Sequence, residues 1–154
     1  MRCFSHHSAN EMLIGRVYVE NSPTFILVVA AAIRDGEGRL LLQQCPPHKR
    51  HAGLWEFPGG KVENEELPTL ALCREILEEL GLELRRDALE PIGFAHELPA
   101  EGRPGIVLLL YSAAGWRGQP EAREGQNWGW FALGDAAALD LPQMDRELLD
   151  RLSG

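Results

Sequence analysis

The sequence predicts an α+β domain in which a mixed β-sheet lies between helices. Runs of β-prone residues stand on both sides of one amphipathic helix, so the order along the chain is strands, helix, strands, helix. The length of 154 residues and the hydrophobic content of 45% suit one domain with a buried core. We expect this domain at residues 24–154. Residues 1–23 are expected to be an extension whose only patterned part, Met12–Val19, favours an extra strand.

The first half of the domain begins with strands and the turn that joins them. Thr24–Ile33 is strongly β-prone, and the turn at residues 35–38 leads into a second strand at Arg39–Gln44. A polar loop, Cys45–Gly53, precedes the short apolar run Leu54–Phe57. The Pro-Gly-Gly sequence directly after this run breaks the strand pattern.

The long helix is expected at about Pro68–Leu80. Pro68 suits the first turn of a helix, and Gly81 is a common stop signal. Five apolar residues at helical spacing predict the face that packs on the core: Leu72, Cys73, Ile76, Leu77 and Leu80.

The second half of the domain is predicted to return to strands and to end in short helices. Alternation in the last strand places Trp128 and Trp130 on one face of the sheet. The strands are expected at Leu89–Glu97, Ile106–Ala113 and Trp128–Leu133, and the helices at Asp135–Leu139 and Asp145–Leu152.

The charge and the cysteines limit the class of protein. A net charge of −8 is unfavourable for binding nucleic acid, and no apolar run approaches the ~20 residues of a membrane helix. The first residues lack a basic segment followed by an apolar one, which predicts no secretory signal. Three widely spaced cysteines suit a reducing compartment, so we expect a cytoplasmic protein.

Three glutamates of the long helix project from a second face: Glu75, Glu78 and Glu79. Like charges at this spacing cost ~0.2–0.5 kcal/mol per pair, and the last turn of a helix prefers cations. No Lys or Arg four residues beyond any of the three compensates for them. A solvated acidic face is the simpler interpretation, but a bound divalent cation resolves the conflict better.

The spacing around these glutamates is diagnostic. Gly60 is followed after five residues by Glu66 and, after seven more, by the run Arg74–Leu82, which reads Arg-Glu-Ile-Leu-Glu-Glu-Leu-Gly-Leu. This segment resembles the complete signature of the Nudix hydrolases, Gly-x5-Glu-x7-Arg-Glu-apolar-x-Glu-Glu-x-Gly-apolar. The resemblance implies the Nudix fold, an α/β/α arrangement with the catalytic loop-helix-loop at residues 60–82.

The resemblance also implies a site for Mg²⁺, with Mn²⁺ as a possible substitute, against the diphosphate of a nucleotide. Arg74 would pair with Glu66 and orient the catalytic helix rather than contact the substrate. Attack of water on a charged phosphorus requires charge neutralisation and a positioned water, which agrees with this role for a metal. The implied metal ligands are the carbonyl of Gly59 and the carboxylates of Glu75, Glu78 and Glu79.

Flanking segments resemble the MutT-type nucleoside triphosphate pyrophosphohydrolases. They are Leu54–Lys61, the run from Trp116 to Pro120, and Glu124-Gly125-Gln126. Glu124 would lie on a loop facing the metals, as a further ligand or as the base; taken alone it would be one more exposed acid. The resemblance implies conversion of a (deoxy)nucleoside triphosphate to the monophosphate and pyrophosphate, for example removal of 8-oxo-dGTP. The implied substrate contacts are Glu56, Phe57, Pro58, Gly59, Gly60, Lys61 and Asp145.

The sequence departs from the MutT pattern in two places. Asp145 stands where an Asn reads the base, and an ionised carboxylate accepts hydrogen bonds only, which favours bases with amino or ring N–H donors. Cytidine-type triphosphates, including 5-methyl-dCTP, are therefore an alternative to 8-oxo-dGTP, and a helix N-cap is an equal interpretation of Asp145. At the end of the second strand, Gln43, Gln44 and Cys45 replace basic residues. Phosphate or base contacts would then come from Arg50, His51, Lys61 or Arg103, each equally explained as exposed surface.

Two rival functions stay open at this stage. Another Nudix substrate, such as a dinucleoside polyphosphate or a nucleotide sugar, is the nearer one. A binding domain that has lost its activity should show a damaged signature, whereas this one is intact at every catalytic position. The choice of general base among Glu75, Glu78 and Glu124, the number of metal ions and the oligomeric state are left open.

Overall fold

A computed structural model describes residues 25–154 of the chain. The extension at residues 1–23 and the extra strand predicted at Met12–Val19 lie outside the described residues. Within residues 25–154, no helix combines the length and the hydropathy needed to cross a membrane.

The strands form two main sheets and a small ribbon. In the first sheet β1 runs parallel to β7, whereas β4 and β6 pair antiparallel at the two edges, so the sheet is mixed as predicted. The first sheet, in the order β4-β1-β7-β6, contains β1 (Phe25–Ile33), β4 (Gly59–Lys61), β6 (Leu89–Glu97) and β7 (Gly105–Ala113). The second, in the order β3-β2-β9, contains β2 (Leu40–Gln44), β3 (Trp55–Glu56) and β9 (Asn127–Phe131). The ribbon pairs β5 (Glu83–Leu84) with β8 (Trp116–Arg117).

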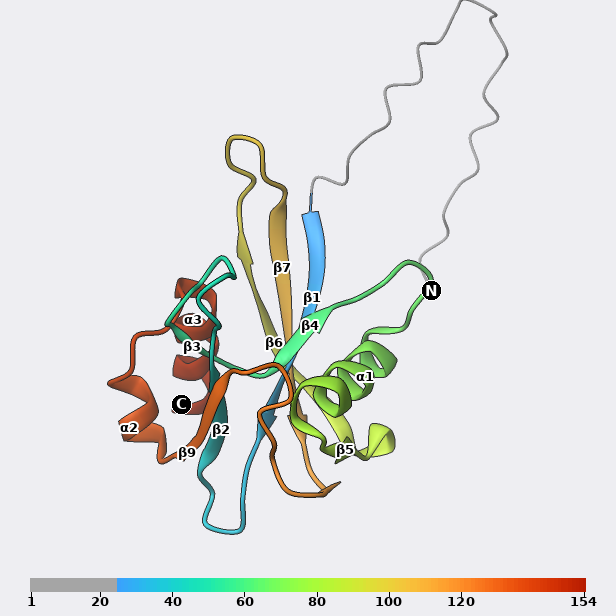
Figure 1. The fold of residues 1–154 in the computed structure, drawn as a ribbon, viewed down its shortest axis with the longest axis vertical. Helices are drawn as coiled ribbons and strands as arrows, with labels where there is room; N and C mark the ends of the chain where they lie inside the picture. The colour runs from blue at the N-terminus through green and yellow to red at the C-terminus, as the bar shows by residue number, and fades with distance from the viewer. Residues whose placement is uncertain (1–24) are drawn as a thin grey trace, which may run out of the picture.

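The helices lie on both sides of the sheets, which confirms the expected α/β/α arrangement. Figure 1 shows α1 (Pro68–Leu80) on one side and α2 (Leu133–Ala137) and α3 (Gln143–Leu152) on the other. A single 3₁₀ turn, η1 (Arg86–Ala88), precedes β6. Both C-terminal helices begin two residues earlier than their sequence pattern predicts, and α3 starts directly after Pro142.

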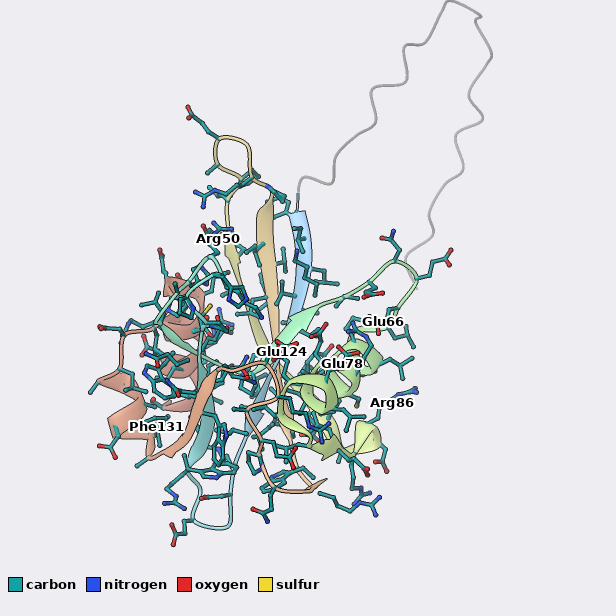
Figure 2. The ribbon with its side chains drawn as sticks, in the orientation of Figure 1. Arg50, Glu66, Glu78, Arg86, Glu124 and Phe131 are labelled. Carbon is teal, nitrogen blue, oxygen red and sulfur yellow. The ribbon has the colours of Figure 1, made fainter. Side chains whose placement is uncertain are left out.

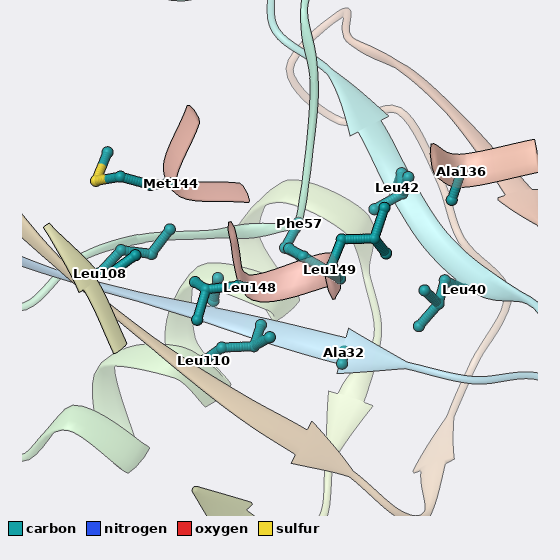
Figure 3. Packing of buried hydrophobic residues seen from close by; sticks show 12 residues of the cluster. Ala32, Leu40, Leu42, Phe57, Leu108, Leu110, Ala136, Met144, Leu148 and Leu149 are labelled. Atoms are coloured by element: carbon teal, nitrogen blue, oxygen red, sulfur yellow. The ribbon is translucent and has the colours of Figure 1, made fainter. Parts of the chain in front are cut away.

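Alternation along β1 divides the core into two clusters. Ala30 and Ala32 face the cluster that contains Leu148 of α3, whereas Val29 and Ile33 face the α1 side. The small side chains of the two alanines leave room for the helix to approach the sheet, and Figure 3 shows α3 lying across β1 and β7 there. Trp128 and Trp130 both pack on the α1 side, as predicted.

The sequence pattern misses the short strand β4, because Pro-Gly-Gly predicts a break, and it misses β5, β8 and η1 as well. In the sheet, Gly59 pairs with Ala30 and Gly60 with Val29. A Cβ atom at Gly59 would lie 1.9 Å from the backbone oxygen of Val29, so only glycine fits this close approach. The pairing with β1 therefore outweighs the low strand propensity of glycine.

The bounds of α1 match the prediction, but its buried face differs from the predicted one. Pro68 begins the helix, and Gly81 ends it in the left-handed conformation (φ 68°), with its N–H donating to the oxygen of Leu77. Leu77, expected in the core, is 43% exposed, whereas Glu79 is buried. The buried face is centred on Leu72 and Leu80, and each residue turns a further 100° around the helix, which carries Leu77 to the edge of that face.

Two substitutions in α1 test this correction. Leu72→Ala removes a fully buried side chain and should lower the free energy of unfolding by about 2–5 kcal/mol. Leu77→Ala is the matched control, because it makes the same chemical change in the same helix, and it should cost less than about 1 kcal/mol. Urea denaturation measures both, and equal losses would show that the helix is rotated relative to this description.

Candidate functional site

A cleft of about 720 Å³ lies where α1, β4, the loop before β3 and the start of α3 come together. Glu75 and Glu79 of α1 line it together with Gly59 and Gly60 of β4. Apolar side chains from β1, β7 and α3, among them Ile26, Leu108 and Met144, line the same cleft together with Phe57 and Asp145. The cleft thus combines an acidic part with a largely apolar part, which is typical of a site for a small ligand.

Glu75 lies directly against the backbone of β4. A Cβ atom at Gly60 would lie 2.3 Å from the carboxyl carbon of Glu75, so the position of this carboxylate requires glycine at residue 60. The absence of a side chain at residue 60 thus leaves room for this carboxylate beside β4.

Glu79 is buried, which the sequence pattern does not predict. Gln43 Nε2 donates to Glu79 Oε2 at 3.0 Å, and Gln126 Nε2 donates to the backbone oxygen of Glu79 at 2.9 Å. Burial raises the pKa of Glu79 to about 7, although Gln43 and Lys49 oppose this shift. The other amide atom of Gln43, Oε1, is buried without a hydrogen-bond partner among the described residues.

Arg74 donates hydrogen bonds to three of the four glutamates of the signature. Its Nε and Nη2 atoms donate to the two oxygens of Glu66, at 2.8 and 2.9 Å. Its Nη1 atom donates to Glu75 at 2.7 Å and to Glu78 at 3.4 Å. The bonds from Arg74 and from the Glu63 N–H lower the pKa of Glu66 to about 2. No Lys or Arg lies four residues beyond any of the three glutamates, but Arg74, four residues before Glu78, compensates for part of their charge.

Two of the predicted metal ligands, Glu78 and Glu124, do not line the cleft. The side chain of Glu78 is 56% exposed and turns toward Arg74 rather than into the cleft. Glu124 Oε2 lies 3.5 Å from Lys49 Nζ. Figure 2 shows Glu66 and Glu78 beside α1 and Glu124 on the loop that crosses toward it. Across residues 25–154, no three Asp, Glu, His or Cys side chains converge into a ready-made metal site.

The donor set nevertheless fits Mg²⁺. This ion is usually held by one or two protein carboxylates together with waters and substrate phosphates, rather than by an all-protein cage. Glu75 and Glu79 supply such a pair of hard oxygen ligands in one cleft. The unpartnered Oε1 of Gln43 is a buried acceptor on the residue that binds Glu79, where a metal-bound water would find a partner.

Asp145 is buried in the first turn of α3, and Pro142 rather than Asp145 is the N-cap. The N-cap interpretation was therefore wrong. Asp145 Oδ1 instead accepts a hydrogen bond from the backbone N–H of Phe57 at 2.9 Å. Burial raises the pKa of Asp145 to about 7. Burial, together with the charges of Asp145 and Glu79, raises the pKa of Glu56 to about 8.

The basic side chains proposed from the sequence all lie at the cleft. Arg50, His51, Lys61 and Arg103 line it. Lys49 lines it as well, and sequence reasoning missed this residue. The rarity of lysine is the one feature of the sequence that could have drawn attention to it, since the chain has only two lysines and both line the cleft. Of the residues that replace basic ones, Gln43 binds Glu79, Cys45 lines the cleft, and Gln44 binds the oxygen of Gly53.

Comparisons with known proteins agree with this geometry. The family model described as NUDIX domain matches residues 24–152. The CTP pyrophosphohydrolase of Escherichia coli (strain K12) is 36% identical over 125 residues, which are 81% of this chain and 90% of the relative. The 8-oxo-dGTP diphosphatase of Haemophilus influenzae is 35% identical over 128 residues, with coverage of 82% and 90%.

Solved structures show the same likeness. The solution structure of the E. coli ORF135 protein has a TM-score of 0.73 at 36% identity and covers 85% of this chain and 90% of its own. The crystal structure of the MutT NUDIX hydrolase from Burkholderia pseudomallei has a TM-score of 0.69 at 34% identity, with coverage of 83% and 98%.

The buried carboxyl of Asp145 predicts a pH dependence of stability. Its pKa is raised, so the folded protein keeps a proton up to about pH 7, whereas the unfolded chain releases it near pH ~4. The free energy of unfolding should therefore fall as pH rises through this window. Asp145→Asn keeps an acceptor for Phe57 but has no proton to lose. Its melting temperature in EDTA should fall less between pH 5 and pH 8 than that of the wild type, and identical pH profiles would contradict the assignment.

Proposed function

The chain belongs to the Nudix family as a hydrolase of the nucleoside triphosphate diphosphatase group, and on this basis we propose that it converts a (deoxy)nucleoside triphosphate to the monophosphate and pyrophosphate with Mg²⁺. Mn²⁺ is the expected substitute. The observation that carries the proposal is that acidic residues and apolar side chains line the same cleft. Its volume of about 720 Å³ is within the range typical of small-ligand sites.

The acidic part of the cleft is suited to the reaction at phosphorus. Bound Mg²⁺ would neutralise phosphate charge and lower the pKa of a water. Glu75, Glu79 and the carbonyl of Gly59 would hold it, with Glu78 and Glu124 as ligands that approach when the metal and substrate bind. Arg74 fixes the direction of the Glu75 carboxylate through its bond of 2.7 Å, and Glu66 fixes Arg74 in turn.

A carboxylate in this part of the cleft takes the proton of the attacking water. Glu75 is our first choice among the three candidates, because it lines the cleft, whereas Glu78 and Glu124 do not. The phosphate oxygens, which carry the negative charge of the substrate, would be bound by Lys61 and Arg103, both of which line the cleft.

The part of the cleft around Asp145 is suited to the base. One oxygen of Asp145 is occupied by the Phe57 N–H, and in the ionised form of the carboxyl the other oxygen is free to accept from an amino group. The amino group of cytosine is such a donor, and a relative at 36% identity is named a CTP pyrophosphohydrolase. Cytidine-type triphosphates are therefore our first candidate substrates. 8-oxo-dGTP is the second, supported by the relatives that are named 8-oxo-dGTP diphosphatases.

A turnover panel tests the function. Purified protein with Mg²⁺ should release pyrophosphate from CTP, dCTP, 5-methyl-dCTP or 8-oxo-dGTP, and the ranking of kcat/KM identifies the base. Diadenosine polyphosphates, ADP-ribose and a nucleotide sugar are the competing substrates. Release of inorganic phosphate alone, preference for the competitors, or no turnover of any compound would overturn the proposal.

Glu79→Gln tests the assignment of the acidic site. The amide keeps an acceptor for Gln43 but removes a negatively charged ligand, so kcat/KM should fall on the order of a hundredfold or more while the fold is retained. Glu83→Gln, an identical change at an exposed position of β5, is the control and should leave turnover unchanged. Near wild-type activity of Glu79→Gln would show that the metal lies elsewhere.

A further inference from the structure

Lys49 joins two loops that are distant in sequence. It lies in the loop between β2 and β3, where its N–H donates to the oxygen of Pro46 at 3.1 Å and its own oxygen accepts from Ala52 at 3.2 Å. Its ammonium group lies 3.5 Å from Glu124, which is on the loop before β9. Lys49 lines the cleft and Glu124 does not, so this ion pair connects the wall of the cleft to the loop before β9.

The surroundings of Lys49 are strongly acidic. Burial lowers the pKa of Lys49, but attraction by Glu79, Glu124 and Glu56 outweighs this effect and raises the pKa overall. Lys49 is thus attracted by three carboxylates, of which Glu124 is its ion-pair partner.

The pair with Glu124 is weak enough to be exchanged. Both side chains are nearly half exposed, and ion pairs of this kind change an equilibrium by only about two- to five-fold. A divalent cation carries twice the charge of an ammonium group and binds carboxylates directly. It would therefore compete with Lys49 for Glu124.

The backbone of Glu124 is held in place by Gln126. Its backbone N–H donates to Gln126 Oε1 at 2.9 Å, and Gln126 Nε2 donates to the oxygen of Glu79 at 2.9 Å. Because Gln126 is buried and both of its amide atoms are bonded, it ties Glu124 to the end of α1. Departure of Lys49 would leave the Glu124 carboxylate free to bind another cation while its backbone stays tied to the end of α1.

We propose that Lys49 is a movable counter-ion: it neutralises Glu124 while the metal is absent and binds a phosphate of the triphosphate once the metal has taken Glu124. The inference rests on the proposed function, because it requires a phosphate ligand in this cleft. An ammonium group has three donors and binds phosphate as a point charge, so it suits an oxygen that the metal leaves uncovered.

The proposal predicts that removing Lys49 changes two affinities in opposite directions. In Lys49→Met, Mn²⁺ should bind the substrate-free protein about three-fold more tightly, because its competitor for Glu124 is gone. The KM of the best triphosphate should rise about tenfold, with a smaller change in kcat, because a charged phosphate contact is lost. In Lys49→Arg, which keeps the positive charge, KM should lie close to the wild-type value. Titration calorimetry or the Mn²⁺ resonance signal measures the first quantity, and steady-state kinetics the second.

Two controls isolate the contact. Arg85→Gln removes the same charge from an exposed pair with Asp87 and should change neither affinity. In a Glu124→Gln background, Lys49→Met should no longer tighten Mn²⁺ binding, because the pair is already absent. Unchanged affinities, or a loss of both, would overturn the proposal. If the wild type hydrolyses no triphosphate, the proposed function fails, whereas the Mn²⁺ measurement still decides whether Lys49 competes for Glu124.

Discussion

The close approach of Glu75 to the backbone of Gly60 is the contact on which the rest of the site depends. Glycine at residue 59 lets β4 lie against β1, and glycine at residue 60 lets α1 bring a carboxylate onto β4. The first glycine sets how closely β4 approaches β1, and the second sets where the Glu75 carboxylate can lie. Every other group at the acidic part of the cleft is placed relative to this helix and strand.

Electrostatics explains how so many acids are tolerated in one place. Arg74 binds Glu66, Glu75 and Glu78 from one side, and Lys49 faces Glu79 and Glu124 from the other. The cations do not fully offset the cost of burying a negative charge on Glu79, since burial still raises its pKa to about 7. Binding of a divalent cation therefore lowers the free energy of a site that buries and crowds its carboxylates in this way.

Local sequence patterns predict the parts of the structure whose causes are local. Pro68 and Gly81 lie next to the helix that they bound, and the spacing from Gly60 to Leu82 identifies the family. The strand at Gly59–Lys61 and the contacts of Gln43, Gln126 and Lys49 depend on chain segments that meet only in the folded protein. The resemblance predicts Asp145 as a base contact, but its bond to Phe57 requires the packing of α3 against the loop.

Gly60→Ala tests the central claim most directly. The added Cβ would meet the end of the Glu75 side chain, which can move, rather than fixed backbone, so the fold should persist by circular dichroism. The displaced carboxylate should lower kcat/KM for the best triphosphate on the order of a hundredfold, because small displacements of a reacting group have effects of this size. A folded Gly60→Ala protein with wild-type kcat/KM would contradict the account.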